Sequence, residues 1–208
     1  MPIQLSWSFV RNVERAIAYQ YMLLANMDER VCQSVCAEKE ALIKTFPALS
    51  AIVTFPHITL LHFSGWLTSA AREKLEKPLC KFLADLCRHH FSFPVELKNY
   101  ESFPQGIIYI CIQNQDAFSD LQNNLRAINL TLKTAGCDSA KIIKYLHVTL
   151  VRGMDTKDYH RILPMYSQRH FHAVFPLKKL TLVRRTIEGG NWQHVEDFCL
   201  PIKRTLFA

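Results

Sequence analysis

The sequence predicts an α+β protein in which antiparallel strands recur in two similar halves of the chain. The pattern His-Ile-Thr-Leu at residues 57–60 returns as His-Val-Thr-Leu at residues 147–150. Each copy lies in a run of β-branched and apolar residues, which is typical of a buried strand rather than of a helix. Apolar residues at helical spacing lie between the strand patterns. Short loops between successive strands favour antiparallel pairing, so we expect antiparallel sheets with helices packed outside them.

Hydrophobic patterning predicts the elements of the first half in chain order: a strand over residues 19–25, a helix over 29–45, the first motif strand over 52–63, a helix over 69–90, and strands over 91–98 and 107–113. Asp28 is the expected N-cap of the first helix and Thr68 or Ser69 of the second, because their side-chain oxygens can accept a hydrogen bond from the first turn. Pro78 predicts a kink or a break in the second helix, since it lacks a backbone N–H. Residues 99–106 are expected to form a loop.

The second half follows a similar plan: a helix from residue 116 to a stop at Gly136, the second motif strand over 142–151, a short helix from residue 155 or 156, and strands over 171–175, 177–187 and 193–200. Gly189 and Gly190 are expected to join the last two strands as a hairpin. No stretch rich in Gly, Pro or Ser separates the halves. We therefore expect one domain over residues 16–208, preceded by an extension of unknown role over residues 1–15.

The composition favours a cytoplasmic protein with a polyanionic partner. The formal net charge of +7 fits an RNA or nucleotide ligand. Seven cysteines, scattered and odd in number, are typical of reduced residues in an intracellular protein. No group of His and Cys residues completes a ligand set, so we expect neither a metal nor a cofactor. No segment approaches 18 consecutive apolar residues, which predicts no membrane span. We expect the chain to act as a monomer.

The repeated motif carries the residues that phosphoester chemistry needs. On a strand, alternate side chains share a face, so His57 and Thr59 project to one side about 6.5 to 7 Å apart, and His147 and Thr149 do the same. Breaking a P–O bond requires one group to deprotonate the attacking oxygen and another to protonate the leaving oxygen. Histidine titrates near neutrality and can do either. Threonine hydroxyls beside the histidines can donate hydrogen bonds to phosphate oxygens.

At these residues the sequence resembles the 2H phosphoesterase superfamily, which includes 2′,3′-cyclic nucleotide phosphodiesterases and the bacterial enzymes called 2′-5′ RNA ligases. That family is defined by two His-x-Thr motifs, and both match here. The resemblance implies a bilobal duplicated fold, with two antiparallel β-sheets facing each other across a central groove and one motif from each lobe. It also implies metal-independent acid-base catalysis by His57 and His147. Family members often have an arginine shortly after the second motif, and Arg152 stands at that place.

The predicted function is hydrolysis of a 2′,3′-cyclic phosphate or a 2′-5′ phosphodiester in RNA or nucleotides. His57 and His147 are the predicted acid and base, in an order that the sequence leaves open, and Thr59, Thr149 and Arg152 are the predicted phosphate ligands. Reversible ligation of RNA ends at the same site is one alternative. A non-catalytic RNA-binding module is another, although a pure binder does not need two titratable groups at matching positions.

Aromatic residues near the motifs are candidates for stacking on a base, namely Tyr100, Phe103 and Tyr145. His62 has the opposite strand parity to His57, so it is expected to face away from the groove. The remaining histidines have no partner at a suitable spacing and are expected at the surface or at edges: His89, His90, His160, His170, His172 and His194.

Overall fold

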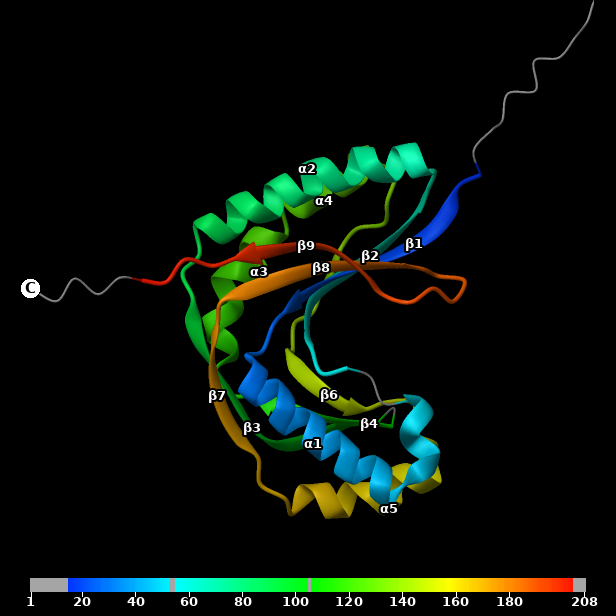
Figure 1. Cartoon of the computed structure of the whole chain (residues 1–208), viewed down its shortest axis with the longest axis vertical. Helices are drawn as coiled ribbons and strands as arrows, with labels where there is room; N and C mark the ends of the chain where they lie inside the picture. Colours follow the sequence, from blue (N-terminus) through cyan, green and yellow to red (C-terminus); the bar gives the residue numbers. More distant parts are fainter. Residues whose placement is uncertain (1–14, 53–54, 105, 204–208) are drawn as a thin grey trace, which may run out of the picture.

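The computed structural model describes residues 15–52, 55–104 and 106–203, so residues 1–14 of the N-terminal extension lie outside the described part (Figure 1). The elements follow in the order β1 (Ile17–Ala25), α1 (Glu29–Thr45), β2 (Ile58–Leu67), α2 (Ser69–Arg88), β3 (Phe93–Phe103), β4 (Ile107–Ile112), α3 (Ser119–Leu125), α4 (Ile128–Thr134), β5 (Lys141–Ile142), β6 (His147–Val151), α5 (Thr156–Ser167), β7 (His172–Leu177), β8 (Lys179–Thr186) and β9 (Gln193–Cys199). Short 3-10 helices lie over Pro47–Ile52 and Gln115–Phe118. No helix in these ranges is both long and apolar enough to cross a membrane.

The strands form two antiparallel groups that meet at a narrow junction. Their order is β7-β3-β4-β6-β2-β1-β8-β9, and β5 pairs with β2. We call β2, β1, β8 and β9 the first-motif lobe, and β7, β3, β4 and β6 the second-motif lobe. The lobes join where Ile58 of β2 pairs with Val148 of β6. The prediction of an α+β fold built from antiparallel sheets is therefore confirmed, with the two sheets continuous through this one pair of residues.

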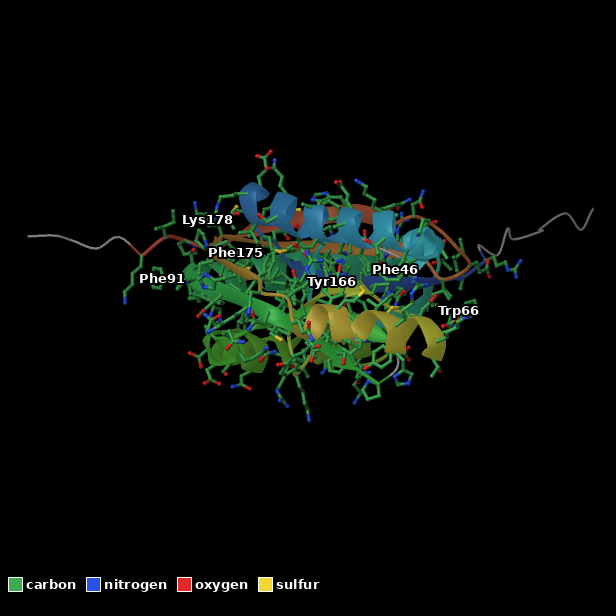
Figure 2. All side chains as sticks on the ribbon, turned by 90° about the horizontal axis from the view of Figure 1, so that it is seen from below. Phe46, Trp66, Phe91, Tyr166, Phe175 and Lys178 are labelled. Atoms are coloured by element: carbon green, nitrogen blue, oxygen red, sulfur yellow. The ribbon has the colours of Figure 1, made fainter. Side chains whose placement is uncertain are left out.

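The helices cover the outer faces of the lobes (Figure 1). Helix α2 packs against β9 and β2 of the first-motif lobe, and α3 and α4 pack against α2. The buried stripe of α2 consists of Leu75, Leu79, Leu83 and Leu86, which have the spacing expected of an amphipathic helix. Helix α1 leaves the first-motif lobe and packs against β6 and β7 of the other lobe, beside α5. Seen from below in Figure 2, α1 and α5 lie across the near side of the molecule, with Phe46 and Tyr166 near them.

The helix caps agree with the sequence, and one expected break does not occur. The Asp28 side chain accepts a hydrogen bond from the Val31 amide, and Thr68 and Asp155 cap α2 and α5 in the same way. Helix α2 continues through Pro78, so of the predicted kink or break, the break does not occur. A proline removes only one helical hydrogen bond, and the apolar stripe on either side of it is long enough to hold the helix together.

Two other expectations fail because of local backbone geometry. The predicted loop over residues 99–106 is largely strand, since β3 continues to Phe103 after a bulge at Asn99, where φ is +56°. The single helix predicted from residue 116 is instead a 3-10 helix, α3 and α4. The amides of Arg126 and Ala127 donate to carbonyls three residues earlier, which interrupts the α-helical pattern between α3 and α4. Gly136 ends α4 as predicted, with φ of +70°.

The first motif strand contains a bulge that changes which side chains share a face. Leu23 of β1 pairs with Leu61, whereas the next residue, Leu24, pairs with Thr59. Leu60 is therefore an extra residue on β2, and both Leu60 and Leu61 are fully buried. Two successive side chains on the core side are the signature of a bulge.

The bulge places His62 on the face opposite to the one predicted. His62 pairs with Met22 of β1, two residues before the partner of Thr59, and residues two apart on a regular strand share a face. His62 and Thr59 therefore lie on the same face of β2. Strict alternation predicted that His62 would face away from the groove, and this prediction is wrong because Leu60 shifts the phase of the strand.

Candidate active site

The two His-x-Thr motifs lie next to each other at the junction of the lobes. Ile58 and Val148, the central residues of the motifs, pair across β2 and β6 and are fully buried. Since alternate side chains point to opposite faces, the histidines and threonines that flank this pair project to the other face of the sheet. His57, Thr59, His147 and Thr149 are all partly exposed there. The antiparallel pairing gives the two motifs an approximate twofold relation about the junction.

Each histidine is held by the same local hydrogen bond. Nδ1 of His57 lies 2.8 Å from the carbonyl oxygen of Phe55, and Nδ1 of His147 lies 2.9 Å from the carbonyl oxygen of Tyr145. A carbonyl oxygen can only accept, so Nδ1 must carry the proton in both rings. In the neutral form Nε2 then holds a lone pair, and in the charged form Nε2 holds the transferable proton. Both imidazoles are thereby oriented and kept in the tautomer that proton transfer at Nε2 requires.

His147 is surrounded by aromatic rings of its own lobe. Its ring centroid lies 5.3 Å from that of Phe103 and 4.9 Å from that of Tyr109. Tyr145 packs edge-on against both of these rings, and it is 40% exposed. The Glu101 carboxylate accepts hydrogen bonds from the hydroxyls of Tyr109 and Tyr145, at 3.0 and 3.2 Å. This network anchors Tyr145, whose carbonyl holds His147.

The three aromatic candidates for base stacking do not lie together. Phe103 and Tyr145 are near His147, as just described. Tyr100 is buried and pairs with Ile110 on the core face, where its ring packs edge-on against Tyr166 with centroids 5.0 Å apart. The bulge at Asn99 gives Tyr100 this direction. The expectation for Tyr100 therefore does not hold, because its ring faces the core beneath α5 and not the motif face.

His57 lies beside two cationic side chains from elsewhere in the fold. Burial lowers the pKa of His57 from its ordinary value, and the nearby charges of Lys39, Arg152 and His147 lower it further, while the hydrogen bond to the Phe55 carbonyl opposes them. Burial also lowers the pKa of His147, opposed by its hydrogen bond to the Tyr145 carbonyl. Both imidazoles of the free protein thus favour the neutral form at pH 7.

Lys39 also belongs to this site, although the sequence motifs did not predict it. It lies on α1 and is only 4% exposed, and burial lowers its pKa to about 8. The nearby charge of Arg152 lowers the same pKa, so the cations Lys39 and Arg152 both lie in the electrostatic neighbourhood of the neutral His57. A signal was present, because position 39 continues the buried stripe of Val31 and Val35 at a spacing of four residues.

A pocket of about 750 Å³ opens beside His57 and Arg152. Its walls come from β1, the start of α1, the segment before β2 and the β8–β9 hairpin, together with Arg152, which follows β6 of the second-motif lobe. Most of its lining is apolar, including Met22, Leu24 and Val183. His57 therefore stands at the edge of a chamber large enough for a small organic ligand.

A comparison with protein-family models decides the family. The model of the 2′-5′ RNA ligase superfamily matches residues 34–188, which include both motifs. This chain belongs to the 2′-5′ RNA ligase superfamily. A curated relative, an uncharacterized protein of Archaeoglobus fulgidus, is 28% identical over 102 residues, which are 41% of this chain and 32% of that protein. The chain thus spans about a third of the length of that relative.

Solved structures share the fold of this 2′-5′ RNA ligase superfamily member. Escherichia coli LigT, crystallised with 3′-AMP, superposes with a TM-score of 0.63 at 14% identity, covering 88% of this chain and 98% of LigT. TT0787 of Thermus thermophilus superposes with a TM-score of 0.58 at 20% identity, covering 89% of this chain and 100% of TT0787. These similarities establish the α+β fold with its antiparallel sheet.

The site offers acid-base groups, hydroxyls and cations, all of which suit a phosphate. In the described ranges, no three His, Cys, Asp or Glu side chains gather closely enough to hold a metal ion. Arg152 lines the pocket together with His57, so the structure brings the predicted phosphate ligand of the second motif beside the histidine of the first. That arrangement could not be inferred from sequence spacing, because it depends on how the lobes meet.

Proposed function

We propose that this 2′-5′ RNA ligase superfamily member is a phosphoesterase that hydrolyses 2′,3′-cyclic phosphate or 2′-5′ phosphodiester bonds in RNA or nucleotides. The main support is the matched pair of Nδ1–carbonyl hydrogen bonds, which presents two Nε2 atoms in the same tautomer on one face. Crystal structures of Escherichia coli LigT, whose fold this chain shares, contain 3′-AMP, ATP or NADP⁺. Nucleotides are therefore the substrate class to test first.

In the proposed reaction, Nε2 of one histidine takes a proton from water as the water oxygen attacks phosphorus. The bond from phosphorus to a ribose oxygen breaks, and Nε2–H of the other histidine protonates that leaving oxygen. One water is consumed, and the histidine protons return by exchange with solvent. Thr59, Thr149 and Arg152 donate hydrogen bonds to the non-bridging oxygens, where negative charge grows in the transition state.

The charges around the two rings favour one assignment of roles. Lys39 and Arg152 disfavour a proton on His57, which suits a base that must start neutral. Among the described residues, burial is what lowers the pKa of His147, so no neighbouring cation opposes a proton there. We therefore propose His57 as the base that activates water and His147 as the acid that protonates the leaving ribose oxygen.

The test is hydrolysis of the four nucleoside 2′,3′-cyclic phosphates and of a 2′-5′-linked diadenylate. His57→Ala and His147→Ala should each lower kcat at least about 10²-fold, because one positioned proton transfer contributes about that much. The double variant should lose less than the product of the two losses, since the pair acts as a unit.

His172→Ala is a matched control, because the His172 side chain is 63% exposed on β7, where its Nε2 lies 3.3 Å from the Glu96 carboxylate. It should retain wild-type turnover. Near wild-type turnover in either single variant of the motif histidines would remove that histidine from the mechanism. Turnover of none of these substrates by the wild-type protein would contradict the proposed function.

A further inference from the structure

The pocket beside His57 is larger and more apolar than phosphate binding requires. A phosphate needs hydrogen-bond donors and cations, which His57 and Arg152 provide at one part of the wall. The rest of the 750 Å³ chamber is lined by side chains such as Met22, Met27 and Trp192. A wall of thioethers and the aromatic rings of Phe55 and Trp192 is suited to a flat, polarisable group. The chamber therefore has room and chemistry for something attached to the phosphate.

Trp192 is held in place before any ligand binds. The guanidinium of Arg185 lies over its ring, 4.6 Å from the centroid. Arg185 in turn donates from Nε and Nη2 to the side-chain oxygen of Gln20, at 3.0 and 2.8 Å. A ring fixed in this way loses little conformational entropy when a ligand stacks on it. Arg185 lies over one face of the indole, which leaves the other face for stacking, and Trp192 is part of the pocket wall.

Polar groups in the pocket wall are also fixed. The Thr181 hydroxyl donates to the Asp197 carboxylate at 2.5 Å, and this uses its only proton. Thr181 can therefore only accept from Asn26, at 3.0 Å, so the NH₂ group of the Asn26 amide must face it. Among the described residues no hydrogen bond uses the Asn26 amide oxygen. An amide that keeps an oxygen and a second N–H for a ligand matches the donor and acceptor edges that nucleobases carry.

We propose that this pocket binds the nucleobase and ribose of the nucleoside whose phosphate lies at His57 and Arg152, with the base stacked on Trp192 and its edge facing Asn26. The inference rests on the proposed function for the position of the phosphate. A plain alkyl chain is a poorer match, because it would leave the amide oxygen and the second N–H of Asn26 without a partner from the ligand. The pocket thus makes this protein selective for nucleotides over other phosphate esters.

The test is calorimetric binding of 5′-AMP and 3′-AMP, with ribose 5-phosphate as the ligand that lacks a base. Wild-type protein should bind at least one nucleotide more tightly than ribose 5-phosphate. Trp192→Ala should weaken nucleotide binding about 5- to 150-fold, the range measured when a stacking aromatic is removed, and should leave ribose 5-phosphate within about twofold. Trp192→Phe should retain most of the affinity, because a ring remains.

Trp66→Ala is the matched control. Trp66 lies on β2 outside the pocket lining, is 68% exposed and appears at the edge of the molecule in Figure 2. It should bind all ligands as the wild type does. Equal affinity of the wild-type protein for both nucleotides and ribose 5-phosphate would overturn the pocket assignment. The assignment would also fail if Trp192→Ala weakened the binding of all three ligands equally while Trp192→Phe bound them as the wild type does.

The two proposals can fail separately, because binding is measured without turnover. The protein could bind nucleotides in a way that depends on the base and on Trp192, and yet hydrolyse none of the test substrates. That result would support the assignment of the pocket and contradict the proposed function. Hydrolysis that depends on both motif histidines, without any preference for a ligand carrying a base, would contradict the pocket alone.

Discussion

The buried ammonium of Lys39 and the imidazole of His57 influence each other within the site. Lys39 is nearly inaccessible to solvent, and its positive charge is one cause of the low pKa of His57. The pKa of Lys39 is itself lowered to about 8, so at pH 7 most of the lysine still carries its charge. The neutral imidazole is favoured, which is the form a general base needs before it accepts a proton.

Replacing Lys39 should therefore change the pH dependence of catalysis. In Lys39→Met the pKa of His57 rises, so the acidic limb of kcat/KM should move to higher pH, and activity at pH 6 should fall by up to about tenfold relative to the optimum. The measurement is a kcat/KM profile on a cyclic nucleotide. Lys44→Met, which removes an exposed lysine of the same helix, should leave the limb in place. An unchanged limb in Lys39→Met would show that Lys39 does not set the state of His57.

At the scale of elements, two β-bulges decide which side chains reach the motif face. The extra residue Leu60 on β2 turns His62 to the side of Thr59. The extra residue Asn99 on β3 lies between Lys98, which pairs with Cys111, and Tyr100, which pairs with Ile110. After this bulge Glu101 pairs with Tyr109, and its carboxylate accepts a hydrogen bond from the Tyr109 hydroxyl. Without the bulges, alternation would exchange the faces of these residues.

The bulge on β3 leads to a prediction about the free energy of unfolding. Asn99 has φ of +56°, in the left-handed region that asparagine and glycine tolerate better than other residues. Asn99→Val should lower the free energy of unfolding by about 1–2 kcal/mol, whereas Asn99→Gly should change it little. Urea denaturation of both variants measures the difference. If the valine and glycine variants prove equally stable, the bulge does not depend on the backbone preference of Asn99.

On the scale of the whole molecule, the lobes are not the two halves of the sequence. Strands β8 and β9 return to the first-motif lobe, while β4 pairs with the second motif strand and β3 pairs with β4. Helix α1 crosses from β1 to the outside of the other lobe. These crossings bring Lys39 of α1, Arg152 after β6 and His57 before β2 into one electrostatic neighbourhood. The site therefore exists only when both lobes are folded together.

The assembled site predicts catalysis that does not depend on a metal ion. In the proposed reaction, imidazole, hydroxyl, guanidinium and ammonium groups transfer the protons and stabilise the negative charge of the phosphate. Hydrolysis of a 2′,3′-cyclic nucleotide should therefore keep at least about half its rate in excess EDTA. The control is the same assay with Mg²⁺ or Mn²⁺ added after chelation. Loss of activity on chelation that either ion restores would mean that a metal generates the nucleophile.

The sequence alone determined what depends on local chemistry. The repeated motif predicted the two histidines and two threonines, alternation predicted that they share a face, and short polar side chains predicted the caps of α1, α2 and α5. The antiparallel α+β fold also followed, because strand patterns joined by short loops leave few other arrangements. These properties involve residues only a few positions apart, so they can be read along the chain.

Only the tertiary structure decided which distant groups meet. Strand phase cannot be read past a bulge, so the direction of His62 and of Tyr100 followed from Leu60 and Asn99 rather than from alternation. Burial of Lys39 beside His57 required α1 to cross between lobes, and the pocket with Trp192 required the β8–β9 hairpin to return beside β1. The physical reason is that such contacts are stabilised by packing between segments far apart in the chain, and local propensities carry no information about that packing.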